Sequence, residues 1–133
     1  MNNVRVRFEA GESASEAELS VLESRLGWEL PADLRSLANE LGDAFVCGAL
    51  DGNDRYSILS FLDLRQIAAA DDWLAEEYIE AGILPFARCE LGGLYLLEKD
   101  GKVRFRLVYS GETILETVAE SYDEFERRIV VQD

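Results

Sequence analysis

The stretch from residue 83 to residue 103, ILPFARCELGGLYLLEKDGKV, decides the fold of this chain because turn signals alternate in it with apolar segments. Gly92-Gly93 permits a tight turn or bulge where any side chain would clash, and Asp100-Gly101 is typical of a hairpin turn. Pro85 lacks an amide donor and has a fixed φ, so we expect it at the start of an edge strand or at a bend. The stretch therefore predicts strands joined by turns. Its core candidates are Phe86, Tyr95, Leu97 and Val103.

The residues that follow extend the same sheet. Short apolar segments at 94–97, 103–109 and 113–118 predict three strands, and Ser110-Gly111 marks the turn between the last two. Ser121 is expected to cap a terminal helix that has acidic residues in its first turn and arginines toward its end, where each sign of charge complements the helix dipole.

The first third of the chain predicts one strand and two helices. Val4–Phe8 alternates apolar and basic residues, which is typical of a half-buried strand. Ser13 and Ser15 each precede a glutamate by three residues, the spacing of a capping box, and Gly27 suits the end of the helix that follows. Pro31 suits the first turn of the second helix. The residues expected to face the core from these helices are Leu19, Leu22, Leu26, Leu34, Leu37, Ala38 and Leu41.

The middle of the chain is expected to hold two short strands, at 45–47 and 56–59, around the turn Asp51-Gly52-Asn53-Asp54. This turn resembles the start of a calcium-binding loop. The later acidic ligand and the alternating ligand spacing of such a loop are missing, so we do not expect a metal site there.

A helix is expected from Phe61 to Ala81, with Leu64, Ile67, Leu74, Ala75 and Tyr78 on its apolar side. Its other side would gather acids that have no neighbouring Lys or Arg between positions 65 and 88. On this helix Trp73 falls among the carboxylates, which would make it a binding hot spot. The alternative, which we favour, is that Asp71-Asp72 interrupts the helix and turns Trp73 into the core.

Composition predicts one acidic domain that spans residues 1–133. The chain has 133 residues, 48% of them hydrophobic, with 13 basic against 27 acidic residues and a net charge of −14. That length is sufficient for a single hydrophobic core. A strongly negative field repels nucleic acid and favours basic protein partners, although the same charge could serve solubility alone.

Catalytic and membrane functions find little support in the sequence. The chain has no histidine, which excludes Ser-His-Asp, Cys-His and histidine-zinc sites, and it has no nucleotide-binding glycine motif. Among 27 acids some carboxylate pair will always lie close together, so such a pair indicates nothing. Cys47 and Cys89 are expected to be buried free thiols rather than a disulfide. No segment suits a signal peptide or a membrane span, so we expect a cytoplasmic protein without a cofactor.

Three segments together resemble the SUKH superfamily, the domain of Smi/Knr-like fungal cell-wall-assembly regulators and of many bacterial immunity proteins. The pattern SEAELSVLESRLGWELPADLRSL at 15–37 is similar to its opening helices. Pro85-Phe86-Ala87, Gly92-Gly93-Leu94-Tyr95 and Gly101-Lys102-Val103 match the second half of its signature, and 121–125 is similar to its closing helix. Two positions depart from the family pattern, Gly42-Asp43 in place of Asn-Gly and Glu98 in place of Asp, and both preserve turn or charge character.

The resemblance implies an α+β fold, a curved and mainly antiparallel sheet with helices packed against it, and no catalytic residues. It also implies an immunity protein that binds and blocks a cognate polymorphic toxin, often a nuclease, in the cell that makes both. The acidic charge suits a basic toxin. The alternative is a regulatory module that binds host proteins, as in the fungal relatives. Nucleic acid and membranes are not expected partners, and the oligomeric state is not indicated. The candidate partner-binding residues are Asp72, Trp73, Glu76, Glu77, Glu80 and Glu90.

Overall fold

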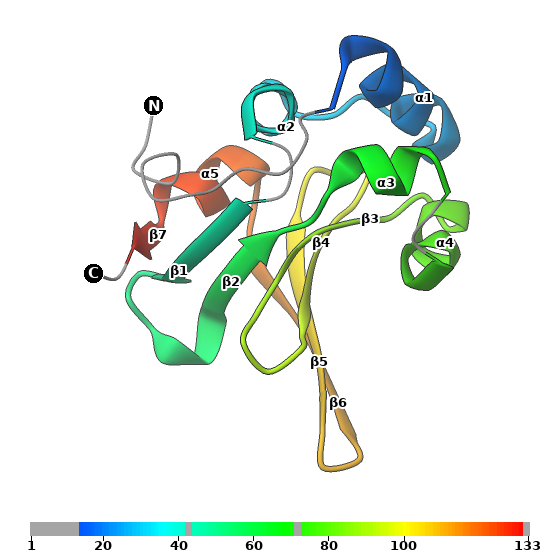
Figure 1. Cartoon of the computed structure of the whole chain (residues 1–133). Helices are drawn as coiled ribbons and strands as arrows, with labels where there is room; N and C mark the ends of the chain where they lie inside the picture. The colour runs from blue at the N-terminus through cyan, green and yellow to red at the C-terminus, as the bar shows by residue number, and fades with distance from the viewer. Residues whose placement is uncertain (1–13, 42–43, 71–72, 132–133) are drawn as a thin grey trace.

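The computed structural model describes residues 14–41, 44–70 and 73–131 and has the α+β architecture predicted from the sequence. Seven strands form one curved sheet in the order β6-β5-β4-β3-β2-β1-β7, and every neighbouring pair is antiparallel where its register is defined (Figure 1). The strands are β1 (Ala44–Leu50), β2 (Ser57–Phe61), β3 (Leu84–Arg88), β4 (Leu94–Leu97), β5 (Val103–Tyr109), β6 (Glu112–Ala119) and β7 (Ile129–Val131). The helices are α1 (Glu16–Leu26), α2 (Ala32–Leu41), α3 (Leu64–Ala68), α4 (Trp73–Glu80) and α5 (Tyr122–Arg127), with a 3₁₀ turn η2 (Asp54–Tyr56) before β2.

Helix α1 begins and ends as its sequence predicts. The Ser15 hydroxyl accepts a hydrogen bond from the Glu18 amide at 3.1 Å, and the Glu18 carboxylate accepts one from the Ser15 amide at 2.9 Å, which completes a capping box. Gly27 closes the helix with φ of 86°. The predicted strand Val4–Phe8 and the alternative cap Ser13 lie outside the described residues.

The helix expected from Phe61 to Ala81 is wrong as one element, because two helices, α3 and α4, occupy this segment, which confirms that the helix is interrupted. Phe61 ends strand β2, and the Asp63 carboxylate then caps α3 by accepting from the Arg65 and Gln66 amides. Helix α3 ends at Ala68, and Ala70 has φ of 60°, a left-handed conformation that no helix continues through. Helix α4 begins at Trp73. The predicted interrupting pair, Asp71-Asp72, lies outside the described residues.

Pro85 lies in an interior strand, not in the edge strand that we expected. Strand β3 pairs with both β2 and β4, but its pairing with β2 covers only Ala87 and Arg88. Pro85 lies before that segment, and the register with β4 shifts between Pro85 and Ala87. An irregularity of this kind accommodates a residue without an amide donor. Pro85 therefore lies beside an irregularity of a central strand, and the expected edge strand is wrong.

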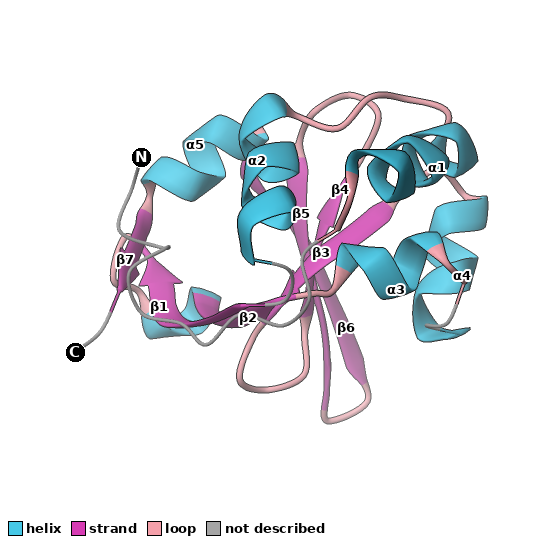
Figure 2. Cartoon of the chain, turned by 45° about the horizontal axis from the view of Figure 1, so that its top comes forward, coloured by secondary structure: helices cyan, strands magenta, loops and turns pink. Residues whose placement is uncertain are grey.

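The helices and one face of the sheet enclose the hydrophobic core (Figure 2). All four core candidates of the 83–103 stretch are fully buried. Phe86 and Tyr95 each lie with their ring centroids 5.1 Å from that of Phe125 on α5, which ties the terminal helix to the middle of the sheet. Such pairs favour edge-to-face and tilted arrangements.

Two features of the sheet were not predicted. Strand β7 pairs with β1 and closes one edge, where a Cβ at Gly48 would lie only 2.6 Å from the Val130 carbonyl oxygen. Cys47 is exposed, against our expectation of two buried thiols, because β1 shifts register between Phe45 and Gly48 and Cys47 itself has φ of 51°. Cys89 is buried as expected, and both thiols are free.

Candidate functional site

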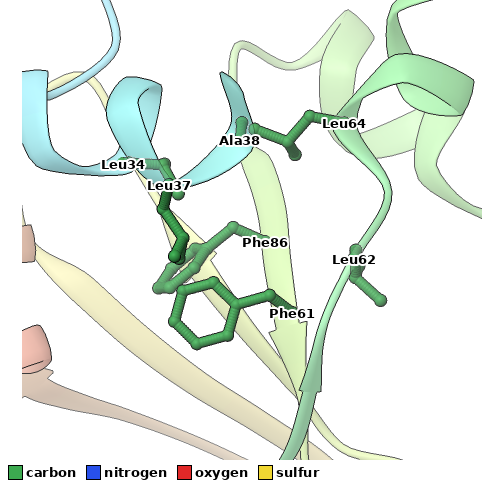
Figure 3. Close-up of a pocket in the computed structure, with 7 residues that line it drawn as sticks. All are labelled: Leu34, Leu37, Ala38, Phe61, Leu62, Leu64 and Phe86. Carbon is green, nitrogen blue, oxygen red and sulfur yellow. The ribbon is translucent and has the colours of Figure 1, made fainter. Parts of the chain in front are cut away.

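The cavity beneath helix α2 is too small to be a binding site. It measures about 10 Å³, roughly the space of one water, and its lining is entirely apolar (Figure 3). The side chains of Leu37, Phe61 and Phe86 converge on it from α2 and from strands β2 and β3. It is a small packing defect of the core.

A groove of about 500 Å³ lies between helix α4 and the outer face of the sheet, where Leu94 and Arg106 point away from their core neighbours Tyr95 and Phe105. This volume is within the range of about 300–1,000 Å³ that is usual for binding pockets. Helix α4 forms one wall, and strands β3, β4 and β5 form the floor. The lining residues are Leu62, Ala75, Glu77, Tyr78, Pro85, Arg88, Gly92, Leu94 and Arg106.

Strand register shows which residues share this outer face. Ser60 of β2 pairs with Arg88 of β3, Arg88 pairs with Leu94 of β4, Leu94 pairs with Arg106 of β5, and Arg106 pairs with Leu115 of β6. Directly paired residues point to the same side of a sheet. These five residues therefore form one row across five strands, which we call the arginine row.

The acidic residues predicted to form one surface on α4 differ in their contacts. Glu76 is not free: its carboxylate accepts a hydrogen bond from the guanidinium of Arg25 on α1, and the two side chains are only 28% and 26% exposed. A distant helix thus supplies the cation that the neighbouring sequence lacks. Glu77 is exposed and lines the groove, and Glu80 is exposed at the end of the helix.

The remaining candidates have different positions. Glu90 is exposed in the loop between β3 and β4, two residues before the groove residue Gly92, and its amide donates to the Ser57 hydroxyl at 3.2 Å. Asp72 lies outside the described residues. Trp73 is the first residue of α4, and the position of its side chain is likewise outside the part described.

Arg88 and Arg106 are groove residues that the sequence did not predict. By sequence pattern alone, each arginine is an ordinary solvent-facing position of a strand. Only the pairing of β3 and β5 with β4 brings the two together on either side of Leu94. The signal in the sequence was weak: two arginines in strands of an acidic chain, 18 positions apart.

In the described part of the chain, no cluster suited to a metal ion and no carboxyl with a raised pKa lines this groove. Residues 14–41, 44–70 and 73–131 contain no group of three His, Cys, Asp or Glu side chains that could hold a metal ion. The pKa of the Asp123 carboxyl is raised, chiefly by a hydrogen bond with the carboxyl of Asp33. Both are exposed in the first turns of α5 and α2 and line neither the groove nor the cavity.

The chain was also compared with known proteins and families. Over the described residues, none of the helices has the length and apolar composition that crossing a membrane requires. No curated protein matches the chain significantly. The sequence profile of the SMI1 / KNR4 family (SUKH-1) matches residues 13–128, from the capping region of α1 to the end of α5, and this range includes the wall and the floor of the groove. The chain therefore belongs to the SMI1 / KNR4 family (SUKH-1).

Proposed function

We propose that this protein is a non-catalytic immunity protein that neutralises a basic toxin by binding it directly in the cytoplasm. Family membership is the observation that supports this proposal most, because members of the SMI1 / KNR4 family are often immunity proteins and are generally non-catalytic. The net charge of −14 supports the choice of a basic partner.

The exposed carboxylates beside the groove are the proposed contact surface. Glu77, Glu80 and Glu90 are exposed and make no ion pair with any residue in the described part of the chain. Unpaired surface charge of one sign accelerates association with an oppositely charged protein and contributes less to final affinity. Glu76 is engaged with Arg25, so we assign it to stability and not to the contact surface.

Co-expression with the product of the adjacent gene tests the proposed function. We expect this chain to restore growth to cells that express a toxic neighbour and to be captured with that neighbour in a pull-down. If no neighbouring product is toxic and no basic partner is captured, the immunity function is wrong. Capture of endogenous cytoplasmic proteins without growth protection would instead favour the regulatory alternative.

Charge reversal tests the contact surface once a toxin is available. We expect the Glu77→Lys/Glu80→Lys variant to bind the toxin about tenfold more slowly at low salt and to differ little at high salt, because screening removes long-range attraction. The matched control, Glu29→Lys/Asp54→Lys, makes the same change in net charge at two exposed acids that do not line the groove. Equal slowing in both variants would show that net charge matters and that the α4 surface does not.

A further inference from the structure

The arginine row is an unusual feature in so acidic a protein. The chain has 27 acidic and 13 basic residues, so most cations should find a carboxylate nearby. Arg104, two residues before Arg106 on the same strand, does so: it pairs with Glu98 at 3.0 Å and with Asp100 at 3.4 Å. Neither Arg88 nor Arg106 forms an ion pair with any residue that the structure describes. Positive charge is therefore left available in the groove.

The guanidinium of Arg88 is held in place by its neighbour in the row. Its Nε donates to the hydroxyl of Ser60 at 2.9 Å, and Ser60 is itself 5% exposed. The terminal nitrogens of Arg88 have no hydrogen-bond partner in the described part of the chain. A guanidinium oriented through Nε can still present its two terminal nitrogens to a carboxylate.

The two arginines flank an apolar strip. Leu94 lies between them in the row, so their backbones are separated by two strand spacings, about 10 Å. Tyr78 and Pro85 add apolar surface at the α4 side of the groove. At the other end of the row Leu115 is 59% exposed, and Val108 beside it is 54% exposed. Large apolar side chains left exposed in one region indicate an interaction surface.

We propose that the arginine row binds a segment of a partner protein in which acidic and apolar side chains adjoin. A carboxylate of the segment would bond to Arg88 or Arg106, and its apolar neighbours would cover Leu94 and Leu115. Glu77, on the α4 wall, repels a carboxylate and so directs it to the floor of the groove. This inference goes beyond the proposed function, because it requires an acidic segment but does not require that the partner be a toxin.

Selection from a random peptide library displayed on phage, with the full chain as bait, tests this proposal and needs no identified partner. We expect the enriched peptides to contain Asp or Glu beside an apolar residue. One enriched peptide, made synthetically, should bind the Arg88→Gln/Arg106→Gln variant at least about tenfold more weakly than the unmodified chain, since charge-assisted hydrogen bonds are lost. The same peptide with its acids changed to amides should be weakened similarly.

A matched variant controls for net charge. Lys99→Gln/Lys102→Gln removes two positive charges from the β4–β5 turn, outside the groove, and should bind the peptide like the unmodified chain. Arg106→Gln alone controls for folding, because the side chain of Arg106 makes no hydrogen bond or ion pair with the described residues, and its replacement should leave the melting temperature unchanged.

Several results would overturn the proposal. They are no enrichment, enriched peptides without acids, and equal binding by the Arg88→Gln/Arg106→Gln variant. A monomer–dimer equilibrium in analytical ultracentrifugation that Arg106→Gln abolishes would assign the row to a second copy of this chain instead. These outcomes are independent of growth protection by co-expression, so the inference and the proposed function can fail separately.

Discussion

Arg25 of α1 bonds through its guanidinium to the carboxylate of Glu76 on α4, 51 positions further along the chain. A second nitrogen of Arg25 donates to the Ile67 carbonyl of α3 at 2.7 Å. One side chain thus joins three helices at the point where the apolar segment after β2 is interrupted. The other carboxylate oxygen of Glu76 is buried and has no hydrogen-bond partner among the described residues, so the charge of Glu76 depends on Arg25.

Removal of this contact should destabilise the protein. We expect Arg25→Ala to lower the free energy of unfolding by about 1–3 kcal/mol, because it leaves a partly buried carboxylate unpaired. Glu76→Lys should cost at least as much, since it places two cations together. The measurement is urea denaturation followed by circular dichroism.

The control for this prediction is a solvent-exposed ion pair. Arg55 bonds to Glu116, but its side chain is 57% exposed, so Arg55→Ala should cost at most about 1 kcal/mol. Glu80→Lys, one helical turn from Glu76 on α4, should also have little effect on stability. If Arg25→Ala proves no more costly than Arg55→Ala, the joining role of Arg25 is wrong.

The two glycines before β4, Gly92 and Gly93, are required for different reasons. Ala and Asn variants at each position distinguish the two reasons. A Cβ at Gly93 would lie 2.9 Å from the Arg106 carbonyl oxygen, whereas a Cβ at Gly92 meets nothing within 4 Å but the backbone there has φ of +89°. Gly93→Ala should therefore destabilise by about 1–3 kcal/mol through overpacking. Gly92→Ala should cost about 1–2 kcal/mol through backbone strain.

Asparagine distinguishes the two causes. It adopts left-handed backbone conformations more readily than alanine, so Gly92→Asn should be less costly than Gly92→Ala. At Gly93 the larger side chain should make Asn worse than Ala. The midpoint of thermal unfolding measures all four variants. The same order of Ala and Asn at both positions would contradict the assignment.

Local signals in the sequence predicted most of the fold. Caps, turns and alternating strands depend on residues within a few positions of one another, as in the capping box of Ser15 and Glu18 or the turn at Asp100-Gly101. Helical periodicity predicted one helix across the break between α3 and α4. The reason is that the apolar side of the pattern continues in phase beyond Ala68.

The candidate site was less predictable because it depends on strand register. The expected acids at Glu77, Glu80 and Glu90 are exposed, but the partner of Glu76 comes from α1. Arg88 and Arg106 lie in the same row only because both are paired with Leu94. Pairings between distant segments follow from the assembled sheet and leave no periodic pattern in the chain.

The two cysteines should differ sharply in reactivity. Cys47 is exposed in β1, whereas Cys89 is 2% exposed and its sulfur accepts a hydrogen bond from the Gly93 amide at 3.1 Å. Because access limits the reaction of a thiol, Ellman's reagent should modify one thiol quickly in the native protein and the second only after unfolding. Cys47→Ser should abolish the fast reaction and leave the slow one. Two fast thiols, or none, would contradict the exposure of Cys47 and the burial of Cys89.

The carboxyl of Asp123 should have a pKa above its ordinary value, because the carboxyl of Asp33 lies beside it. A hydrogen bond with Asp33 is the main cause that raises the pKa of Asp123, and Arg127 lowers it in part. A raised pKa in the folded state means that Asp123 contributes stability below its unfolded pKa of about 3.9. That contribution is lost as the pH rises through the pKa that Asp123 has in the folded state. At neutral pH the two neighbouring carboxylates repel each other.

Carbon-detected NMR titration of the Asp123 carboxyl measures this coupling directly. We expect Asp33→Asn to lower the pKa of Asp123 toward its ordinary value, because the variant removes the second negative charge and its amide can donate a hydrogen bond to the ionised Asp123 carboxylate. Asp54→Asn, at an exposed acid in η2, removes the same charge elsewhere and should leave the pKa of Asp123 unchanged. An Asp123 pKa that is the same in the Asp33→Asn variant would show that the two carboxyls do not interact in solution.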